Sequence, residues 1–182
     1  MKEIIVLKVD SKEDMDDFIQ FPNLLYADCP YYVPDLDIDV QSTFNPQKNA
    51  GLEFSEIQAF IVFNREGKLL GRIAGIINHR ANRKWKTRYV RFGFFDFVDD
   101  IRVSSALLNA VSQWGKEKGM EYIQGPMGIT DFDKEGMLIE DFDKMGSMNT
   151  LYNYPYYPQH METLGYEKEV DWIQIRIDIP KE

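Results

Sequence analysis

The stretch that most constrains the fold runs from residue 88 to 119, RYVRFGFFDFVDDIRVSSALLNAVSQWGKEKG. Its first ten residues are largely apolar on both faces, which is typical of a central strand. Apolar residues then repeat at the spacing of an amphipathic helix capped by Ser104 or Ser105 and ended by Gly119: Leu107, Leu108, Val111 and Trp114. A strand that leads into a helix predicts an α/β domain. It also raises a question, because a helix N-terminus readily holds a phosphate group.

The first half of the chain predicts two further strands joined as a hairpin. EIQAFIVF and KLLGRIAGII flank the turn NREG, in which Gly67 is free to take a positive φ. Before them, MKEIIVLKVD predicts a first strand, and two short helices follow it, one capped by Ser11 and one starting at Pro22. A third helical stretch is predicted around Val40.

The last third of the chain predicts a short buried strand, a long loop, a short helix and a closing strand. MEYIQGP is the buried strand, and PYYPQHMETLGY is the helix, ended by Gly165. VDWIQIRIDI alternates apolar and polar residues, which indicates a strand. The loop between, residues 126 to 151, is long for a connection within a domain and is expected to act as a lid.

Composition narrows the class of protein. A chain of 182 residues, 44% of them hydrophobic, predicts a single domain over residues 1 to 182, with no apolar run long enough to cross a membrane. Cys29 is the only cysteine, so no internal disulfide is predicted, and a reducing cytoplasm is the expected location. The formal charge of −9 argues against nucleic acid as a partner and favours a cationic or neutral ligand.

One basic segment, HRANRKWKTRYVR at residues 79 to 91, departs from this acidic background. It is expected to be either a solvated hairpin tip or a patch that binds an anion or a partner, with Trp85 as a stacking platform.

Taken together, the order of strands and helices resembles the GNAT acyltransferase fold, an α/β (α+β) fold with a mixed, mostly antiparallel central sheet flanked by helices. Several stretches look closer still to a largely uncharacterised bacterial group of GNAT-like proteins: FPNLLYADCPYYVPDLDID, GRIAGIINHRAN, FGFFDF, GMEYIQGPMG and YNYPYYPQHMETLGY. Members of that group are about twice as long, so the chain resembles an N-terminal half. The resemblance therefore implies a second GNAT-like domain or a homodimer as partner.

The resemblance also implies an acyl-CoA donor, such as acetyl-CoA, bound where the fourth and fifth strands separate. Its pantetheine arm would pair with the backbone of Phe94, Phe95, Asp96, Phe97 and Val98, and its pyrophosphate would lie near Ser104 and Ser105.

The pyrophosphate loop departs from the family's glycine-rich pattern. No glycine stands between Gly93 and Gly115, and Asp99 and Asp100 lie at the helix start. Each carboxylate would repel a diphosphate at about 6 Å by roughly 1 to 3 kcal/mol per charge pair. We therefore expect this junction to bind pyrophosphate poorly.

The family's general acid is also missing. It is a tyrosine four residues before the glycine of a closing motif, a position that Met161 occupies here. Tyr157 or His160 could substitute for it, and Glu140 in the acidic loop could serve as base for an amine. A purely structural role for the aromatic residues and for the acidic loop stays open.

The sequence offers little support for a metal site. Residues 131 to 136 follow the start of a calcium loop, but Phe142 stands where the bidentate glutamate should be. Two histidines and one cysteine across the chain are too few to predict a zinc site.

Three functions therefore remain open, and with them whether the chain is an enzyme. It could be an N-acyltransferase that moves an acyl group from acyl-CoA to an unknown amine despite a degenerate CoA motif. It could be a non-catalytic GNAT-fold module that binds a small molecule or a partner domain. It could also be a paired-GNAT transferase that uses an aminoacyl-tRNA donor through residues 79 to 91, although the acidic charge opposes this.

Overall fold

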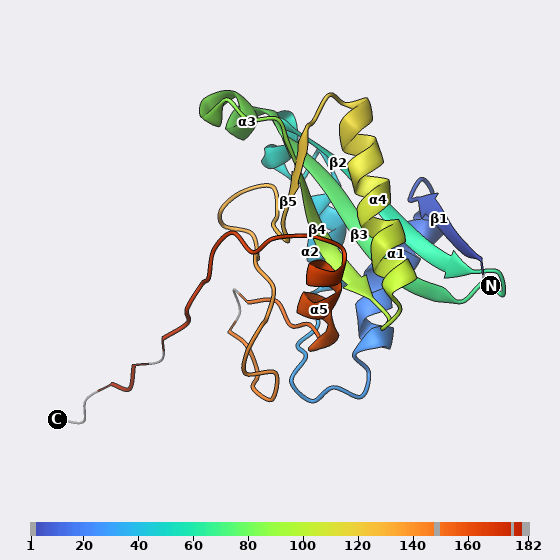
Figure 1. The fold of residues 1–182 in the computed structure, drawn as a ribbon. Helices are drawn as coiled ribbons and strands as arrows, with labels where there is room; N and C mark the ends of the chain where they lie inside the picture. Colours follow the sequence, from blue (N-terminus) through green and yellow to red (C-terminus); the bar gives the residue numbers. More distant parts are fainter. Residues whose placement is uncertain (1–2, 148–149, 176, 180–182) are drawn as a thin grey trace.

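The computed structural model describes residues 3–147, 150–175 and 177–179 and has a twisted sheet at its centre (Figure 1). Its strands follow one another in chain order: β1 (Ile4–Lys8), β2 (Ser55–Asn64), β3 (Leu69–Asn78), β4 (Tyr89–Phe97) and β5 (Tyr122–Gln124). The first four are antiparallel, and β5 runs parallel to β4. The predicted hairpin is confirmed, with Gly67 at a φ of 77° in its turn.

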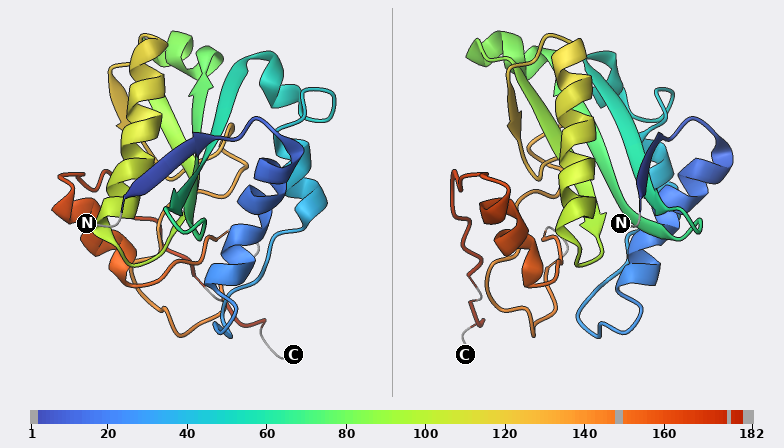
Figure 2. Two further views of the ribbon diagram at one scale, coloured as in Figure 1. Left: turned by 90° about the vertical axis from the view of Figure 1, so that its right-hand side faces the viewer. Right: turned by 45° about the vertical axis from the view of Figure 1, so that its right-hand side comes forward.

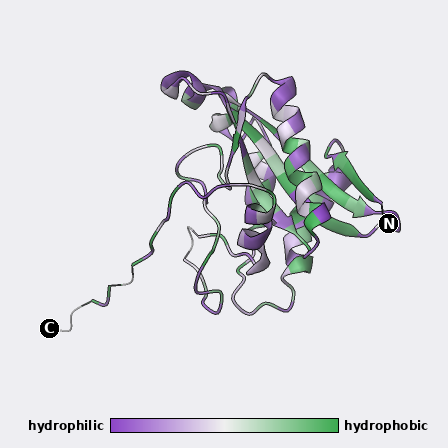
Figure 3. Ribbon diagram, viewed as in Figure 1, coloured by the Kyte–Doolittle hydropathy of each residue, from purple (hydrophilic) through white to green (hydrophobic). Residues whose placement is uncertain are grey.

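Helices cover both faces of the sheet (Figure 2). The helix α4 (Ile101–Glu117) packs on one face over Phe60, Ile73, Val90 and Phe92. The helices α1 (Lys12–Leu25) and α2 (Asp37–Thr43) pack on the other face, over Ala59, Ile61 and Ala74. The strands of the centre are correspondingly apolar (Figure 3). Among the described residues, no helix is long and apolar enough to cross a membrane.

The two short helices predicted after β1 are a single helix, α1, with Pro22 inside it. Proline lacks the N–H that would bond to the carbonyl of Phe18, four residues earlier. Arg72 Nη1 donates to that carbonyl instead, at 2.9 Å. The helix therefore continues past Pro22, because a buried arginine satisfies the group that the proline leaves open.

Two further predictions of local structure are wrong, the cap of α4 and the burial of β5, whereas the basic segment is an exposed tip between β3 and β4 that contains an unpredicted helix. The basic segment begins with a helix, α3 (His79–Trp85), because the Asn78 side chain caps it at the N–H of Ala81. The cap of α4 is Asp100, whose carboxylate accepts from the N–H of Arg102. β5 is short and partly exposed, since it lies at the edge of the sheet.

The C-terminal part also differs from prediction. The short helix is present as α5 (Tyr156–Thr163) and ends before Gly165, which has a φ of 81°. The predicted closing strand is absent from residues 170–175 and 177–179, which lie away from the sheet. Alternation makes this segment suited to a strand but does not decide which strand it pairs with. Residues 126–147, 150 and 151 form the long connection, without helix or strand.

Candidate functional site

The pairing of β4 with β5 stops early, and the freed edge of β4 lies where the sequence predicted the acyl donor. Only Tyr89, Val90 and Arg91 pair with β5. We use the name donor groove for the β5-facing edge of β4 from Phe92 to Val98, together with the first turn of α4. In this region β4 carries a register shift, with Phe94 at a φ of 49°. A bulge of this kind is common beside functional sites because it redirects side chains.

Backbone groups of the donor groove are already hydrogen bonded to side chains of α5 and to the backbone of Met127. The Phe97 N–H donates to the Tyr157 hydroxyl at 3.1 Å, and the Tyr156 hydroxyl donates to the Phe97 carbonyl at 2.5 Å. The Phe92 carbonyl accepts from the N–H of Met127 at 2.8 Å. A pantetheine arm that paired with β4 at these positions would have to displace these bonds.

The backbone N–H groups of Arg102, Val103 and Ser104 in the first turn of α4 also have hydrogen-bond partners already. The Asp100 side chain accepts from the N–H of Arg102, and the Asp100 carbonyl accepts from those of Val103 and Ser104. The Ser104 hydroxyl bonds to His160 Nδ1 at 2.9 Å, and His160 Nε2 bonds to Asp99 at 3.0 Å. A hydrogen bond from Arg102 lowers the pKa of Asp100, so this carboxylate stays ionised beside the turn. These groups do not fit a coenzyme A pyrophosphate.

The structure brings two of the three predicted catalytic residues together. The rings of Tyr157 and His160 both contact Phe97, with centroid distances of 4.2 and 5.2 Å. Glu140 is exposed in the long loop and does not contribute to the walls of the pocket described below. Burial, followed by the charge of Asp96, raises the pKa of Tyr157 well above its ordinary value. Tyr157 therefore holds its proton firmly.

The predicted donor-binding residues point in different directions. Phe95 and Phe97 are buried under α4 and α5, whereas Phe94 packs beside Phe18 and Phe44 on the α1 side. The N–H of Val98 donates to Leu70, and Ser105 accepts from Asn109. These predicted donor-binding residues are therefore not arranged around a common ligand.

Asp96 belongs to a buried polar network that the sequence reasoning missed. Its carboxylate accepts from Arg72 Nε at 2.8 Å and from the Tyr26 hydroxyl at 3.1 Å. The hydroxyls of Tyr26 and Tyr157 lie 2.7 Å apart, which links this network to α5. The available signal was Arg72 itself, a charged residue inside the apolar strand GRIAGII, since a buried charge requires a partner.

A pocket of about 330 Å³ lies between α2, the bulged part of β4 and the start of the long connection. We call it the α2–β4 pocket. Its apolar lining includes Ile76, Phe94, Met127, Ile129 and Met137. Four carboxylates also line it, those of Asp35, Asp39, Asp96 and Asp133, against two cations, Arg72 and Lys134. The pocket therefore combines an apolar surface with an excess of negative charge.

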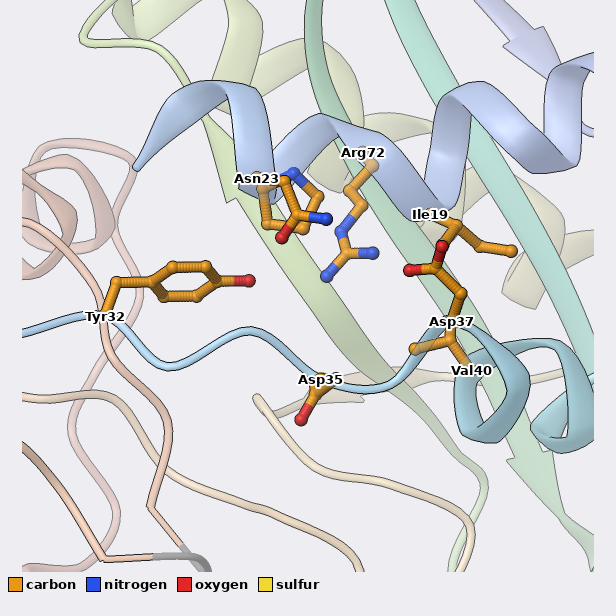
Figure 4. Close-up of a pocket in the computed structure, with 8 residues that line it drawn as sticks. Ile19, Asn23, Tyr32, Asp35, Asp37, Val40 and Arg72 are labelled. Atoms are coloured by element: carbon orange, nitrogen blue, oxygen red, sulfur yellow. The ribbon is translucent and has the colours of Figure 1, made fainter. Parts of the chain in front are cut away.

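Arg72 lines both this pocket and a water-sized one, of about 10 Å³, under α1 (Figure 4). Figure 4 shows its guanidinium between α1 and the segment that carries Asp35 and Asp37, with the Tyr32 hydroxyl pointing toward it. Burial, followed by the charge of Asp96, raises the pKa of Tyr32. The acidic segment 35–39 thus forms one wall of both spaces.

One prediction concerns the contact of α5 with β4. Replacing Tyr156 with phenylalanine removes the hydroxyl that donates to Phe97 and leaves the ring in place. We expect a loss of about 1 kcal/mol in the free energy of unfolding, measured by urea denaturation. Tyr122→Phe at the exposed sheet edge is the control and should change it little. Equal effects of the two substitutions would show that the hydroxyl does not hold α5 to β4.

Comparisons with known proteins give relatives of about twice the length. No protein-family model matches the chain. It is 33% identical over 172 residues to protein YghO of Escherichia coli, covering 93% of this chain and 44% of that protein. It is 24% identical over 177 residues to the bacterial ceramide synthase of Caulobacter vibrioides, covering 97% of this chain and 46% of that protein. The chain thus spans about half the length of these curated relatives.

Solved structures share the fold at low sequence identity. A tandem GNAT protein from the clavulanic acid biosynthesis pathway matches with a TM-score of 0.55 and 10% identity, over 91% of this chain and 43% of that one. A predicted acetyltransferase of Clostridium acetobutylicum, solved with acetyl-CoA, matches with a TM-score of 0.51 and 12% identity, over 96% of each chain.

Proposed function

This chain has the GNAT fold, and we propose that it binds an amphipathic primary amine in the α2–β4 pocket as the acceptor of an N-acyl transfer. The observation that carries the proposal is an apolar lining beside the bulge of β4 together with two more carboxylates than cations. Arg72 pairs with Asp96 and Lys134 pairs with Asp35, while Asp39 and Asp133 also line the pocket. An ammonium group is attracted by the carboxylates, and its hydrocarbon chain is removed from water by the apolar side chains.

The position of the pocket supports acyl transfer to a bound amine. Phe94, Phe95 and Asp96 of β4 line the pocket, and the same strand borders the donor groove. An amine held there would lie on the opposite side of β4 from α4. The relative named as a bacterial ceramide synthase supports the same chemistry, because ceramide is the amide of a fatty acid and a long-chain amino alcohol.

In this proposal the chain binds the acyl acceptor, and none of its residues is assigned to binding the acyl donor. The closed donor groove does not fit coenzyme A, so the acyl donor is expected to reach the amine by another surface. The role of Tyr157 in this proposal is to position the pocket wall through its bonds to Phe97 and Tyr26. Glu140 stays a prediction as base for the amine.

Calorimetric titration with octylamine, octanol and ethylamine tests this proposal. Each buried methylene contributes about 0.8 kcal/mol, so burial of about three or four of the extra methylenes of octylamine should make it bind about 100-fold more tightly than ethylamine. Octanol has the same chain without the charge and should bind more weakly than octylamine. Equal affinities for octylamine and octanol would contradict the proposal, because the carboxylates would then not contribute.

A matched pair of variants tests whether a carboxylate of the pocket itself attracts the amine. Asp39→Asn should weaken octylamine binding by roughly tenfold, the effect of one carboxylate a few ångströms from an ammonium group at a protein surface. Asp16→Asn on α1 removes the same charge away from the pocket and should leave the affinity unchanged. An equal loss in both variants would show that only the overall charge of the protein attracts the amine.

A further inference from the structure

The helix α3 and the residue after it present a tryptophan and three cations to solvent. Figure 1 shows α3 next to the start of β4, at the end of the sheet opposite α5. Trp85 is 68% exposed, and Arg83, Lys84 and Lys86 beside it are exposed as well. We call residues 83–86 the cationic end of α3. Residues 79–91 contain no Asp or Glu, although the whole chain has 30 of them.

The charges of the cationic end are not neutralised by neighbouring carboxylates. Within the part of the chain that the structure describes, Arg83, Lys84 and Lys86 have no ion pair. Arg88, which follows the helix, pairs with Glu121 instead. The ammonium group of Lys84 lies over the neighbouring tryptophan ring, 4.9 Å from its centre. An anionic partner would therefore meet unpaired cations and an exposed indole on the same surface.

Hydrogen bonds at the base of α3 hold this surface in one orientation. The Asn78 side chain caps the helix by accepting from the N–H of Ala81. The Asn82 side chain donates to the carbonyl of Tyr89 at 2.9 Å and accepts from the N–H of the same residue at 3.2 Å. These bonds tie α3 to β4. A partner that binds the cationic end therefore has little backbone to order, which favours binding.

A bilayer with anionic headgroups fits this surface better than RNA does. Tryptophan is enriched where membranes meet water, and lysine and arginine near a bilayer are attracted by anionic headgroups. Proteins commonly follow a nucleic acid strand with a positively charged groove, whereas the cationic end is part of a short, exposed helix. A flat bilayer contacts only such a protruding end. Salt screens charges more than about 10 Å away, so the acidic residues elsewhere oppose the contact little.

We propose that the cationic end of α3 docks on the anionic surface of a membrane. The Trp85 ring lies in the headgroup layer, and Arg83, Lys84 and Lys86 contact lipid phosphates. The attachment is peripheral and reversible, because a few cations and one ring supply much less binding free energy than a membrane-spanning helix. This inference rests on α3 alone and is independent of the amine pocket.

Co-sedimentation of the whole chain with lipid vesicles tests the proposal. With about 30% phosphatidylglycerol in phosphatidylcholine, we expect binding in dilute salt that is lost near 1 M salt, where charges are screened within about 3 Å. The combined replacement Arg83→Gln, Lys84→Gln and Lys86→Gln should weaken binding about 100-fold, at roughly fivefold for each cation. Tryptophan emission of the wild type should shift to shorter wavelength on binding, and Trp85→Phe should lose this shift.

The control removes the same number of charges elsewhere on the surface. Arg65→Gln and Lys68→Gln lie in the turn before β3, at the other end of this strand from α3, and Lys144→Gln lies in the long connection. This triple variant should keep the wild-type affinity for the vesicles. Equal weakening in the two triple variants would overturn the proposal, because only the overall charge would then matter.

Three further results would also overturn the proposal. The first is a wild-type chain that does not bind the phosphatidylglycerol vesicles. The second is equal binding to vesicles of phosphatidylcholine alone, since the cations would then not contribute. The third is binding to a single-stranded RNA oligonucleotide without binding to the vesicles, which would assign the cationic end to a nucleic acid.

Discussion

Replacing Asp96 with alanine is expected to destabilise the fold by about 3 to 5 kcal/mol, the usual cost of leaving one member of a buried ion pair alone. Arg72 is 5% exposed, and its guanidinium would lose the carboxylate that lies 2.8 Å away. The Tyr26 hydroxyl would lose an acceptor in the same change. For a domain of this size the melting temperature should fall by about 10 °C, measured by calorimetry.

The matched control is the double replacement Arg72→Met with Asp96→Leu. Removing both charges leaves no uncompensated ion, so this variant should be more stable than Asp96→Ala. The Phe18 carbonyl loses its donor in the double variant, so full recovery is not expected. If Asp96→Ala costs less than about 1 kcal/mol, the network does not hold α1 to the sheet.

The second large effect is expected from Gly75→Val on β3. A Cβ at this position would lie 2.8 Å from Cε3 of Trp114 and 3.2 Å from Cγ1 of Val111, so α4 would have to move outward. Overpacking of this kind costs typically about 1 to 3 kcal/mol. Urea denaturation would measure the loss.

Gln113→Val is the control for Gly75→Val, because it places the same side chain on the exposed side of α4. It should cost only the few tenths of a kcal/mol by which valine disfavours a helix. Similar losses in the two variants would contradict close packing of α4 on β3.

Much of the fold followed from periodicity. The antiparallel hairpin, the central strand β4 and the amphipathic helix α4 were predicted from residues that repeat at the spacing of strands and helices, and the structure has them. The GNAT fold implied by their order is confirmed by the solved structures. Local patterns were sufficient here because each element buries one continuous apolar face.

Contacts between distant residues explain the failures. Pro22 does not end α1, because Arg72, fifty positions later, bonds to the freed carbonyl. Asp100 caps α4 in preference to Ser104, which faces His160 across 56 positions. The closing strand predicted from alternation is absent from residues 170–175 and 177–179, because no local rule supplies the neighbour that a strand requires.

The candidate site was predictable only in part. Tyr157 and His160 were placed near β4 by the resemblance, and the structure brings both against Phe97. The carboxylates of the α2–β4 pocket come from three separate parts of the chain: Asp35 and Asp39, then Asp96, then Asp133. Only folding brings them together, so sequence spacing could not reveal them.

The central claim is that α5 and Asp100 occupy the donor groove and that ligand binding belongs to the α2–β4 pocket. Titration of the protein with acetyl-CoA, followed by calorimetry, tests it most directly. We expect no saturable heat up to about 1 mM, since the Phe97 backbone and the first turn of α4 are already hydrogen bonded. A dissociation constant below about 10 µM, roughly 7 kcal/mol of binding free energy, would contradict the account.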